Sequence, residues 1–282
     1  MITRHRNTIL QSIHGKPFAA DVFYKPTNKS KPIVIFCHGF KGFKDWGPFD
    51  QVADTFVDAG FVYVKFNFSH NGTTLAQPLD FADLEAFGNN NMSIELDDLG
   101  VVIDWINSPQ FILNPSEINT NKIYLLGHSR GGGIVILKAK EDTRIKKIAT
   151  WASVNEFGKF WTGEQLETMN REGVLYTPNA RTNQQMPLYA QLYKNYFDNL
   201  PRLFIPDAVK QTTIPFLVIH GTEDEAVPFS TALQMHQWNN TIQLLLLEHA
   251  KHTFGGKHPF NEQYLPDDLE DACKATIDFF KE

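Results

Sequence analysis

Short runs of apolar residues recur along the chain, and segments with helical spacing lie between them. The runs are rich in β-branched and aromatic residues and cover residues 33–37, 61–68, 122–126, 145–154, 215–219 and 241–247. Within each run the apolar residues follow one another with little polar alternation. This pattern is typical of strands that are covered on both faces.

The segments between the runs predict helices. In residues 93–107 most of the apolar positions stand three or four residues apart, which places them on one face of a helix. Further helices are predicted over residues 50–59, 132–140, 230–238 and 269–280. Strands that alternate with helices favour an α/β fold, in which helices cover both faces of a mostly parallel central sheet. At one edge of that sheet, residues 7–13 and 17–24 predict an N-terminal antiparallel hairpin.

The segment 155–213 interrupts this alternation. It separates two predicted strands that a single helix would normally connect. It contains a polar linker at residues 179–185 and a predicted helix over residues 187–200. We therefore predict that residues 1–282 form a single domain and that residues 155–213 are an inserted cap, or lid, over one end of the sheet.

Composition and charge exclude several classes of partner. The chain has 26 Lys and Arg and 32 Asp and Glu, a formal net charge of −6, and nucleic acids and anionic membranes require clustered positive charge. No stretch approaches the ~18 uninterrupted apolar residues of a membrane span. The two cysteines, Cys37 and Cys273, lack metal-ligand spacing, and residues 8–15 are too polar for a signal sequence. We expect a cytoplasmic protein with no nucleic-acid or membrane partner.

One motif identifies a candidate nucleophile. Gly127-His-Ser-Arg-Gly131 directly follows the predicted strand 122–126 and directly precedes the predicted helix 132–140. In this context a G-x-S-x-G motif forms a sharp turn that strains the backbone of the serine, and the two glycines leave room for the turn. We expect Ser129 to present its hydroxyl at the carboxyl end of the sheet. A serine hydroxyl needs a base to accept its proton and an acid to orient that base.

The acid is expected at the end of the fifth apolar run. His220-Gly-Thr-Glu-Asp224 follows this run, and the turn ends at Val227-Pro228. Glu223 and Glu225 are neighbours, but Asp224 has the best placed short side chain. We predict Asp224 as the acid, with a solvated acidic loop as the alternative.

The base is expected after the sixth run, where both His249 and His252 occur. His252 is favoured because His249 follows the strand too closely to swing towards Ser129. A metal site formed by Glu248, His249 and His252 is disfavoured, since the segment lies between a strand and two glycines and is not helical. The resulting order of Ser, Asp and His along the chain is that of the α/β-hydrolases.

Acyl transfer also requires donors for the oxyanion that develops on the carbonyl oxygen. The backbone N–H of Arg130, the residue after the candidate nucleophile, is one candidate. The other is the backbone N–H of Phe40, which lies in the glycine-flanked bend His38-Gly-Phe-Lys-Gly42 after the first apolar run.

Taken in order, these four motifs resemble the α/β-hydrolase superfamily over almost the whole chain. Within it the chain is similar to a branch of serine esterases and small acyl-peptidase-like hydrolases that includes bacterial cinnamoyl esterases. The resemblance implies nucleophile Ser129, acid Asp224, base His252 and oxyanion donors Phe40 and Arg130, with no cofactor and no metal. It implies hydrolysis of a small-molecule carboxylic ester with a small or aromatic acyl group, and it is compatible with a homodimer.

Two alternative functions stay open at this point. A peptidase or acyl-peptide hydrolase would use the same triad, and a non-catalytic binding protein would use the same fold. Residues 66–72 stand where relatives often have an aspartate and an arginine, so the polar lining of the site differs there. His70 in that segment either contacts substrate or is a loop histidine bonded to backbone.

The chain is also rich in aromatic residues, at 13%. Many of them lie in the predicted cap, where Tyr189, Tyr193 and Phe197 form one stripe at helical spacing and Leu192 and Tyr196 form a second. Stripes of this kind usually pack against the body of a protein. The alternative is that some of these rings line an acyl pocket.

Overall fold

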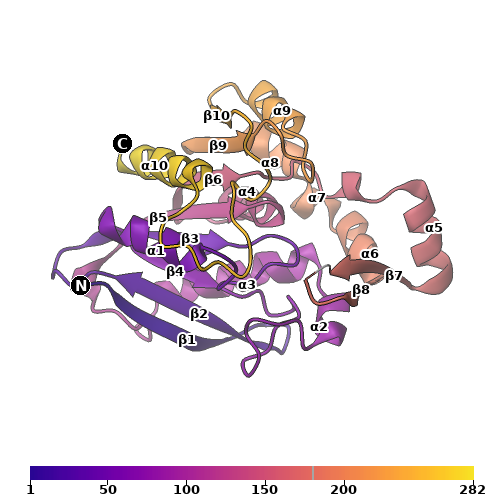
Figure 1. Cartoon of the computed structure of the whole chain (residues 1–282), viewed down its shortest axis with the longest axis horizontal. Coiled ribbons are helices and arrows are strands. Elements are labelled where there is room, and N and C mark those ends of the chain that lie inside the picture. The colour runs from indigo at the N-terminus through magenta and orange to yellow at the C-terminus, as the bar shows by residue number, and fades with distance from the viewer. Residues whose placement is uncertain (180) are drawn as a thin grey trace.

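The computed structural model describes residues 1–179 and 181–282, without the side chain of Phe160. Its main feature is a sheet of eight strands (Figure 1). The strands lie in the order β1-β2-β4-β3-β5-β6-β9-β10. Their bounds are β1 (Thr3–Gln11), β2 (Pro17–Tyr24), β3 (Lys31–Cys37), β4 (Val62–Phe66), β5 (Ile118–His128), β6 (Ile145–Trp151), β9 (Phe216–Gly221) and β10 (Gln243–Leu247). The run from β4 to β10 is parallel, whereas β1 and β2 are antiparallel. The predicted parallel sheet with an N-terminal hairpin is confirmed.

Helices cover both faces of this sheet. One face carries α3 (Met92–Ile106), α4 (Arg130–Glu141), α8 (Ile205–Gln211) and α9 (Ser230–Trp238). The other face carries α1 (Phe49–Asp58) and α10 (Asp267–Lys281). The described part also contains the short helices α2 (Leu84–Gly88), η1 (Pro115–Glu117) and η2 (Gly158–Phe160).

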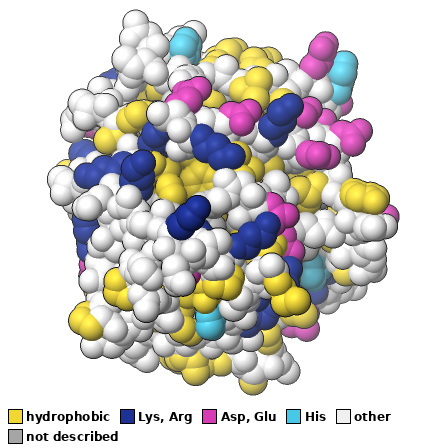
Figure 2. All heavy atoms as spheres, turned by 90° about the vertical axis from the view of Figure 1, so that its left-hand side faces the viewer, with side chains coloured by type: hydrophobic (Ala, Val, Ile, Leu, Met, Phe, Trp, Pro, Cys, Tyr) yellow, Lys and Arg dark blue, Asp and Glu magenta, His cyan; other side chains and the backbone are white. Residues whose placement is uncertain are grey.

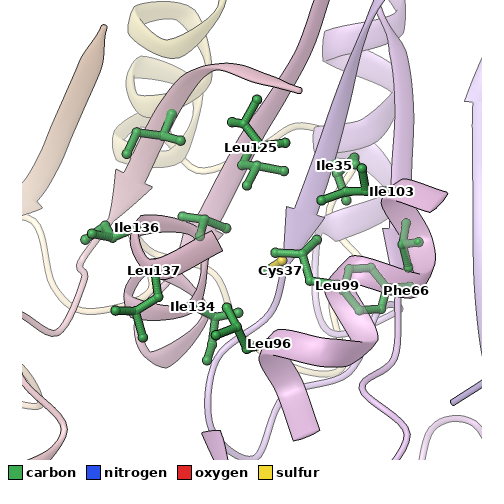
Figure 3. Close-up of a cluster of buried hydrophobic side chains, with 14 of the residues drawn as sticks. Ile35, Cys37, Phe66, Leu96, Leu99, Ile103, Leu125, Ile134, Ile136 and Leu137 are labelled. Atoms are coloured by element: carbon green, nitrogen blue, oxygen red, sulfur yellow. The ribbon is translucent and has the colours of Figure 1, made fainter. Parts of the chain in front are cut away.

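Side chains of each central strand enter two separate cores. Along β3, Ile35 and Cys37 pack towards α3 and α4, and Figure 3 shows Ile35 beside Ile103 and Cys37 beside Leu99 of α3. The alternate residue Phe36 packs towards α1 and α10. Because both faces are buried, the strand sequence contains no polar alternation, and this produces the continuous apolar runs from which the strands were predicted.

The segment between β6 and β9 adds elements outside the main sheet. They are α5 (Gly163–Glu172), β7 (Val174–Asn179), β8 (Gln184–Tyr189), α6 (Gln191–Asp198) and α7 (Leu200–Leu203). β7 and β8 pair as a separate hairpin, in which Pro187 stands opposite Tyr176. The helix predicted over residues 187–200 is therefore shorter, because its first residues belong to β8. Its buried residues Leu192 and Tyr196 join the same core as α3 and α4.

The hairpin β7–β8 and α6 are hydrogen-bonded to the segment that contains α2. The side-chain amide of Gln191 donates to the carbonyl oxygens of Gly88 and Asn90, at 3.2 and 2.9 Å. The hydroxyl of Tyr189 donates to Glu85 at 2.6 Å. Lys41, in the bend after β3, donates to the backbone of Pro178 at 2.8 Å. These contacts join the inserted segment to the loops at the carboxyl end of the sheet.

A buried charge cluster anchors the chain after that bend. Asp21, Asp45 and Asp50 bring carboxylate oxygens within 4.8 Å of one another, a spacing that a metal ion could bridge. Here, however, the Lys65 ammonium donates to Asp45 and Asp50 at 2.5 Å each, and Lys44 donates to Asp21 at 2.8 Å. Lys65 and Asp21 are fully buried. The two lysines, together with Arg6, which donates to Asp50 at 2.5 Å, thus supply the positive charge that a buried carboxylate cluster requires.

The same cluster fixes backbone as well as charge. The Lys65 ammonium also donates to the Lys44 carbonyl oxygen at 2.9 Å, and the Lys44 N–H donates to the Asn67 side chain at 2.7 Å. Burial by itself raises the pKa of Asp50, but Lys65 and Arg6 outweigh it and lower the pKa to about 2. The chain that follows residues 38–42 is therefore fixed to β4 by ion pairs and by hydrogen bonds to its backbone.

Figure 2 shows the end of the molecule at the amino ends of the parallel strands, where several lysine and arginine side chains surround a hollow with an apolar floor. This hollow has a volume of about 360 Å³ and is lined by Phe61, Tyr124 and Phe280 together with Lys122 and Lys147. It lies opposite the strand ends that carry the candidate nucleophile. In the described part of the chain, no helix is long and apolar enough to cross a membrane.

Replacing Lys65 with Met removes one charge of the buried cluster and leaves Asp45 and Asp50 without their shared ammonium. We expect the free energy of unfolding to fall by about 3 kcal/mol, measured by urea denaturation. Lys257→Met is the matched control, because Lys257 pairs with Glu262 at 3.2 Å on the surface and such pairs contribute less than about 1 kcal/mol. Equal stability of the two variants would contradict the anchoring role of Lys65.

Candidate active site

Ser129 lies at a strained turn between β5 and α4. Its φ and ψ are 56° and −120°, a conformation that residues with a side chain rarely adopt. The turn is tightly enclosed, because a Cβ atom at Gly127 would lie 2.3 Å from the Gly131 carbonyl oxygen and one at Gly131 would lie 2.3 Å from that of Cys37. The Ser129 N–H donates to the Trp151 carbonyl oxygen at 2.8 Å. The glycines of the motif thus permit the turn that the sequence predicts.

The loop between β10 and α10 brings His252 to this serine. The His252 Nε2 atom lies 3.0 Å from the Ser129 hydroxyl oxygen, and its Nδ1 atom lies 2.8 Å from the Asp224 carboxylate. Since the carboxylate accepts, Nδ1 carries the proton and Nε2 is free to accept the serine proton. His252 is partly exposed, with 24% of its side-chain surface accessible.

Asp224 has a buried carboxylate, which the turn after β9 holds by its backbone. One oxygen accepts hydrogen bonds from the N–H groups of Ala226 and Val227, at 2.9 and 2.8 Å. Burial alone would raise the pKa of Asp224, but the hydrogen bonds with His220 and His252 and the backbone donation outweigh it, so the pKa lies well below its usual range. The carboxylate therefore remains ionised and can stabilise a positive charge on His252.

His220 is a further partner of this carboxylate that the sequence analysis did not single out. Its Nε2 atom lies 3.1 Å from the Asp224 carboxylate and 2.8 Å from the Val227 carbonyl oxygen. Both neighbours are acceptors, so Nε2 carries a proton. The spacing of four residues between His220 and Asp224, within one motif, is the feature of the sequence that could have identified His220 as a partner of the acid.

The neighbouring residues Glu223, Glu225 and His249 lie on the surface, away from Ser129. His249 lies 2.8 Å from Glu223 on the surface, and 76% of its side-chain surface is exposed. Glu225 is exposed as well. The structure therefore brings Asp224 and His252 together with Ser129 and places Glu223 and His249 in a separate surface pair.

The bend after β3 passes directly against the nucleophile. A Cβ atom at Gly39 would lie 2.9 Å from the Ser129 Cβ atom. His38 holds this bend, because its Nδ1–H donates to the Gly39 carbonyl oxygen at 2.9 Å and its Nε2 accepts from the Phe68 N–H at 3.4 Å. Burial lowers the pKa of His38 to about 4, which keeps the ring neutral. Phe40 directly follows Gly39 in this bend.

Arg130 is the first residue of α4, where a backbone N–H has no partner within the helix. Its side chain is anchored to α3, because Nε donates to Glu95 at 3.0 Å and Glu95 also accepts from Asn90 at 2.7 Å. Burial raises the pKa of Glu95, although Arg130 opposes this shift. The Arg130 guanidinium lies 5.6 Å from the centre of the Phe40 ring, so the side chains of the two expected oxyanion donors are also in contact.

His70 has local partners. Its Nδ1 atom lies 2.8 Å from the Ser69 hydroxyl oxygen. Burial and the neighbouring Lys16 lower its pKa to about 4, so the ring is neutral. The bond of the His70 ring is thus with a neighbouring side chain, and the backbone bond that the sequence suggests is not seen in the described part of the chain.

A groove of about 530 Å³ lies next to the segments that carry the candidate nucleophile and acid, although none of the triad side chains lines it. Two of its residues are buried: Val154, whose N–H donates to the Ser129 carbonyl oxygen at 3.3 Å, and Val227, which lies three residues after Asp224. The lining also contains the apolar residues Pro228 and Leu233 and the polar residues Asn155, Lys159 and Gln234, which are linked by hydrogen bonds of 2.8 to 3.3 Å. The groove separates the start of the inserted segment from α9 and offers space for part of a substrate.

Comparison with known proteins identifies the family of the chain. Residues 48–266 match the model of the prolyl oligopeptidase family, and this range contains Ser129, Asp224 and His252. An uncharacterized 31.7 kDa protein of Escherichia coli is 26% identical over 204 residues, which cover 69% of this chain and 65% of that protein. A Mycoplasma genitalium protein named "Putative esterase/lipase 2" is 27% identical over 280 residues, 99% of this chain and 84% of that protein.

Solved structures share the fold. Est1E from Butyrivibrio proteoclasticus with bound ferulic acid has a TM-score of 0.72 and 20% identity, over 97% of this chain and 98% of Est1E. An esterase domain from Rhodothermus marinus has a TM-score of 0.64 and 16% identity, over 99% and 97% of the two chains. The expected α/β-hydrolase fold is confirmed, and the chain belongs to the prolyl oligopeptidase family.

Proposed function

We propose that the chain is a serine hydrolase that cleaves carboxylic esters of small or aromatic acids through an acyl-Ser129 intermediate. The observation that carries this proposal is the continuous series Ser129–His252–Asp224, with contacts of 3.0 and 2.8 Å, at a strained turn. A serine hydroxyl bonded to a neutral imidazole, which is in turn bonded to a buried carboxylate, is the arrangement that activates serine for attack on a carbonyl carbon.

In the first half of the reaction the Ser129 oxygen attacks the ester carbonyl carbon, and His252 Nε2 accepts the serine proton. Asp224 stabilises the imidazolium that forms. The negative charge on the carbonyl oxygen is stabilised by the N–H groups of Phe40 and Arg130. His252 then returns the proton to the alkoxy oxygen, the C–O bond breaks, and the alcohol leaves.

In the second half His252 accepts a proton from water, whose oxygen attacks the acyl carbon. The bond to the Ser129 oxygen breaks, His252 protonates that oxygen, and the carboxylic acid leaves. Residues of this chain alone supply the base, the acid and the oxyanion donors. The proposal therefore requires no cofactor and no metal.

The groove formed by the residues after β6 and by α9 offers room for the proposed acyl group. Its lining combines apolar residues, among them Pro228 and Leu233, with amide and ammonium groups. An aromatic or short acyl group gains contact with the apolar residues, and the amide and ammonium groups can bind its polar substituents. The fold shared with Est1E, whose structure contains ferulic acid, is consistent with an aromatic acyl group.

A second candidate is cleavage of a peptide or acyl-peptide bond. It is favoured by the match of residues 48–266 to the prolyl oligopeptidase family, since the same triad can cleave an ester or an amide. A non-catalytic binding role ranks below both, because the hydrogen bonds between Ser129, His252 and Asp224 are intact.

We further propose that residues 155–213 serve as the cap of the site and that the protein acts in the cytoplasm.

Replacing Ser129 with Ala removes the nucleophile. We expect kcat for short p-nitrophenyl esters to fall by about 10⁶-fold and labelling by a fluorophosphonate to be lost. Thermal unfolding of the variant, followed by circular dichroism, verifies that it is folded. Unchanged ester hydrolysis by a folded S129A variant would refute the proposed mechanism.

Replacing Asp224 with Asn preserves shape but removes the charge that orients and stabilises His252. We expect kcat to fall by about 10⁴-fold, measured with the same esters. Glu223→Gln is the matched control in the same turn, and we expect its kcat to stay close to that of the wild-type protein because Glu223 pairs with the exposed His249. The reverse ranking would assign the acid to Glu223.

A series of esters that differ only in the acyl group tests the substrate class. We expect kcat/KM for acetyl, butyryl and cinnamoyl esters to exceed that for palmitoyl esters by about tenfold or more, because polar groups such as Lys159 and Gln234 interrupt the apolar lining of the groove. A peptide amide with the same acyl group is measured in parallel. Faster cleavage of the amide than of the ester would favour the peptidase alternative.

A further inference from the structure

His128, which directly precedes the candidate nucleophile, contacts the backbone of the candidate base. Its Nε2 atom lies 2.9 Å from the carbonyl oxygen of His252. A carbonyl oxygen can only accept, so Nε2 of His128 carries the proton and donates it. The two imidazole rings are close neighbours, with centroids 4.9 Å apart and planes inclined by 52°.

The loop that carries His252 needs such an external contact. It follows β10 and contains two non-glycine residues with positive φ, His249 at 61° and Phe254 at 51°. Before His252 the loop is fixed to the acid turn, because the Glu223 N–H donates to the Ala250 carbonyl oxygen at 3.0 Å. After His252 it is closed by its own backbone, through the Phe254 N–H and the Lys251 carbonyl oxygen, which are 3.0 Å apart.

The bond from His128 therefore holds the base at its own residue. His128 and Ser129 are consecutive residues. The hydrogen bond from His128 therefore links the His252 carbonyl to the backbone that also carries the nucleophile. That backbone is itself fixed, since the Ser129 N–H donates to Trp151 at 2.8 Å. Both residues of the His128–Ser129 dipeptide thus contact His252, and together these contacts set the distance between the Ser129 hydroxyl and His252 Nε2.

The charge state of His128 fits this arrangement. Burial and the neighbouring His252 lower the pKa of His128 to about 3. The ring stays neutral when His252 becomes an imidazolium, so His128 adds no full positive charge beside it. A protonated histidine at this distance would oppose the proton transfer from Ser129.

We propose that His128 is a positioning residue, whose Nε2–H holds the His252 carbonyl oxygen and thereby sets the hydrogen bond between Ser129 and His252. The proposal rests on the proposed serine-hydrolase function for its kinetic consequences. Its geometric content does not depend on that function, because the hydrogen bond and the separation of Ser129 and His252 can be measured without a substrate.

Two amide variants distinguish the loss of the hydrogen-bond donor of His128 from a change in the volume of its side chain. His128→Gln places an amide nitrogen at the reach of Nε2, whereas His128→Asn places it at the reach of Nδ1, too short to contact His252. We expect the Asn variant to lose about 10²-fold in kcat per fluorophosphonate-titratable site with little change in KM, because a displaced base loses its near-attack geometry. The Gln variant should retain most of the wild-type kcat.

His249→Asn provides a control on the same loop, since His249 is exposed and pairs with Glu223. We expect it to leave kcat and KM close to the wild-type values. Counting active sites with the fluorophosphonate removes the contribution of misfolded protein from the comparison. Equal kcat for the Asn and Gln variants, whether both are retained or both are lost, would overturn the positioning role.

Crystal structures of the wild-type protein and the two His128 variants test the geometric part directly. We expect the Ser129–His252 hydrogen bond to persist in the wild-type and Gln proteins and to lengthen beyond hydrogen-bond distance in the Asn protein. An unchanged bond in the Asn protein would overturn the proposal even if activity falls. A wild-type protein that neither hydrolyses esters nor reacts with the fluorophosphonate would instead refute the proposed function.

Discussion

The close approach of three backbone segments around Ser129 is the constraint on which the rest of the structure depends. β5, the start of α4 and the bend after β3 meet at distances that admit no side chain at Gly39, Gly127 or Gly131. This approach forces the strained φ of Ser129 and brings the bend that carries Phe40 beside it. The strain is maintained because the sheet below is packed on both faces and cannot relax at one corner.

Buried polar groups hold the surrounding loops in this geometry, by two different means. Close to Ser129, His38 and His128 are neutral rings that bond to backbone carbonyls, so they orient chain segments without adding full charge next to the candidate base. Further away, Lys65 and its carboxylate partners fix the chain after the bend by paired charges. This arrangement of neutral groups near the site and paired charges beyond it suits the proposed mechanism, in which charge develops at Ser129 and His252.

Much of the fold could be predicted because the signals are local. Continuous apolar runs identify buried strands, and the glycines around Ser129 identify the turn. The inserted segment is harder to predict from sequence, since Pro187 suggests the start of a helix although it lies in the hairpin β7–β8. Proline occurs both at the start of a helix and in an edge strand, and only the pairing of β8 with β7 distinguishes the two. The partners His220, His128 and Glu95 were not singled out, because their roles depend on what lies beside them in space.

The sequence by itself determined the alternation of strands and helices in the main sheet, the position of the strained turn, and the candidate residues Ser129, Asp224 and His252, since each follows from residue type and spacing along the chain. Only the tertiary structure decided that His128 donates to the His252 backbone, that the Arg130 side chain is anchored to Glu95 of α3, and that Lys65 lies among three carboxylates. Those contacts join segments far apart in the chain, and their distances are set by the packing of the sheet and its loops, which no local pattern encodes.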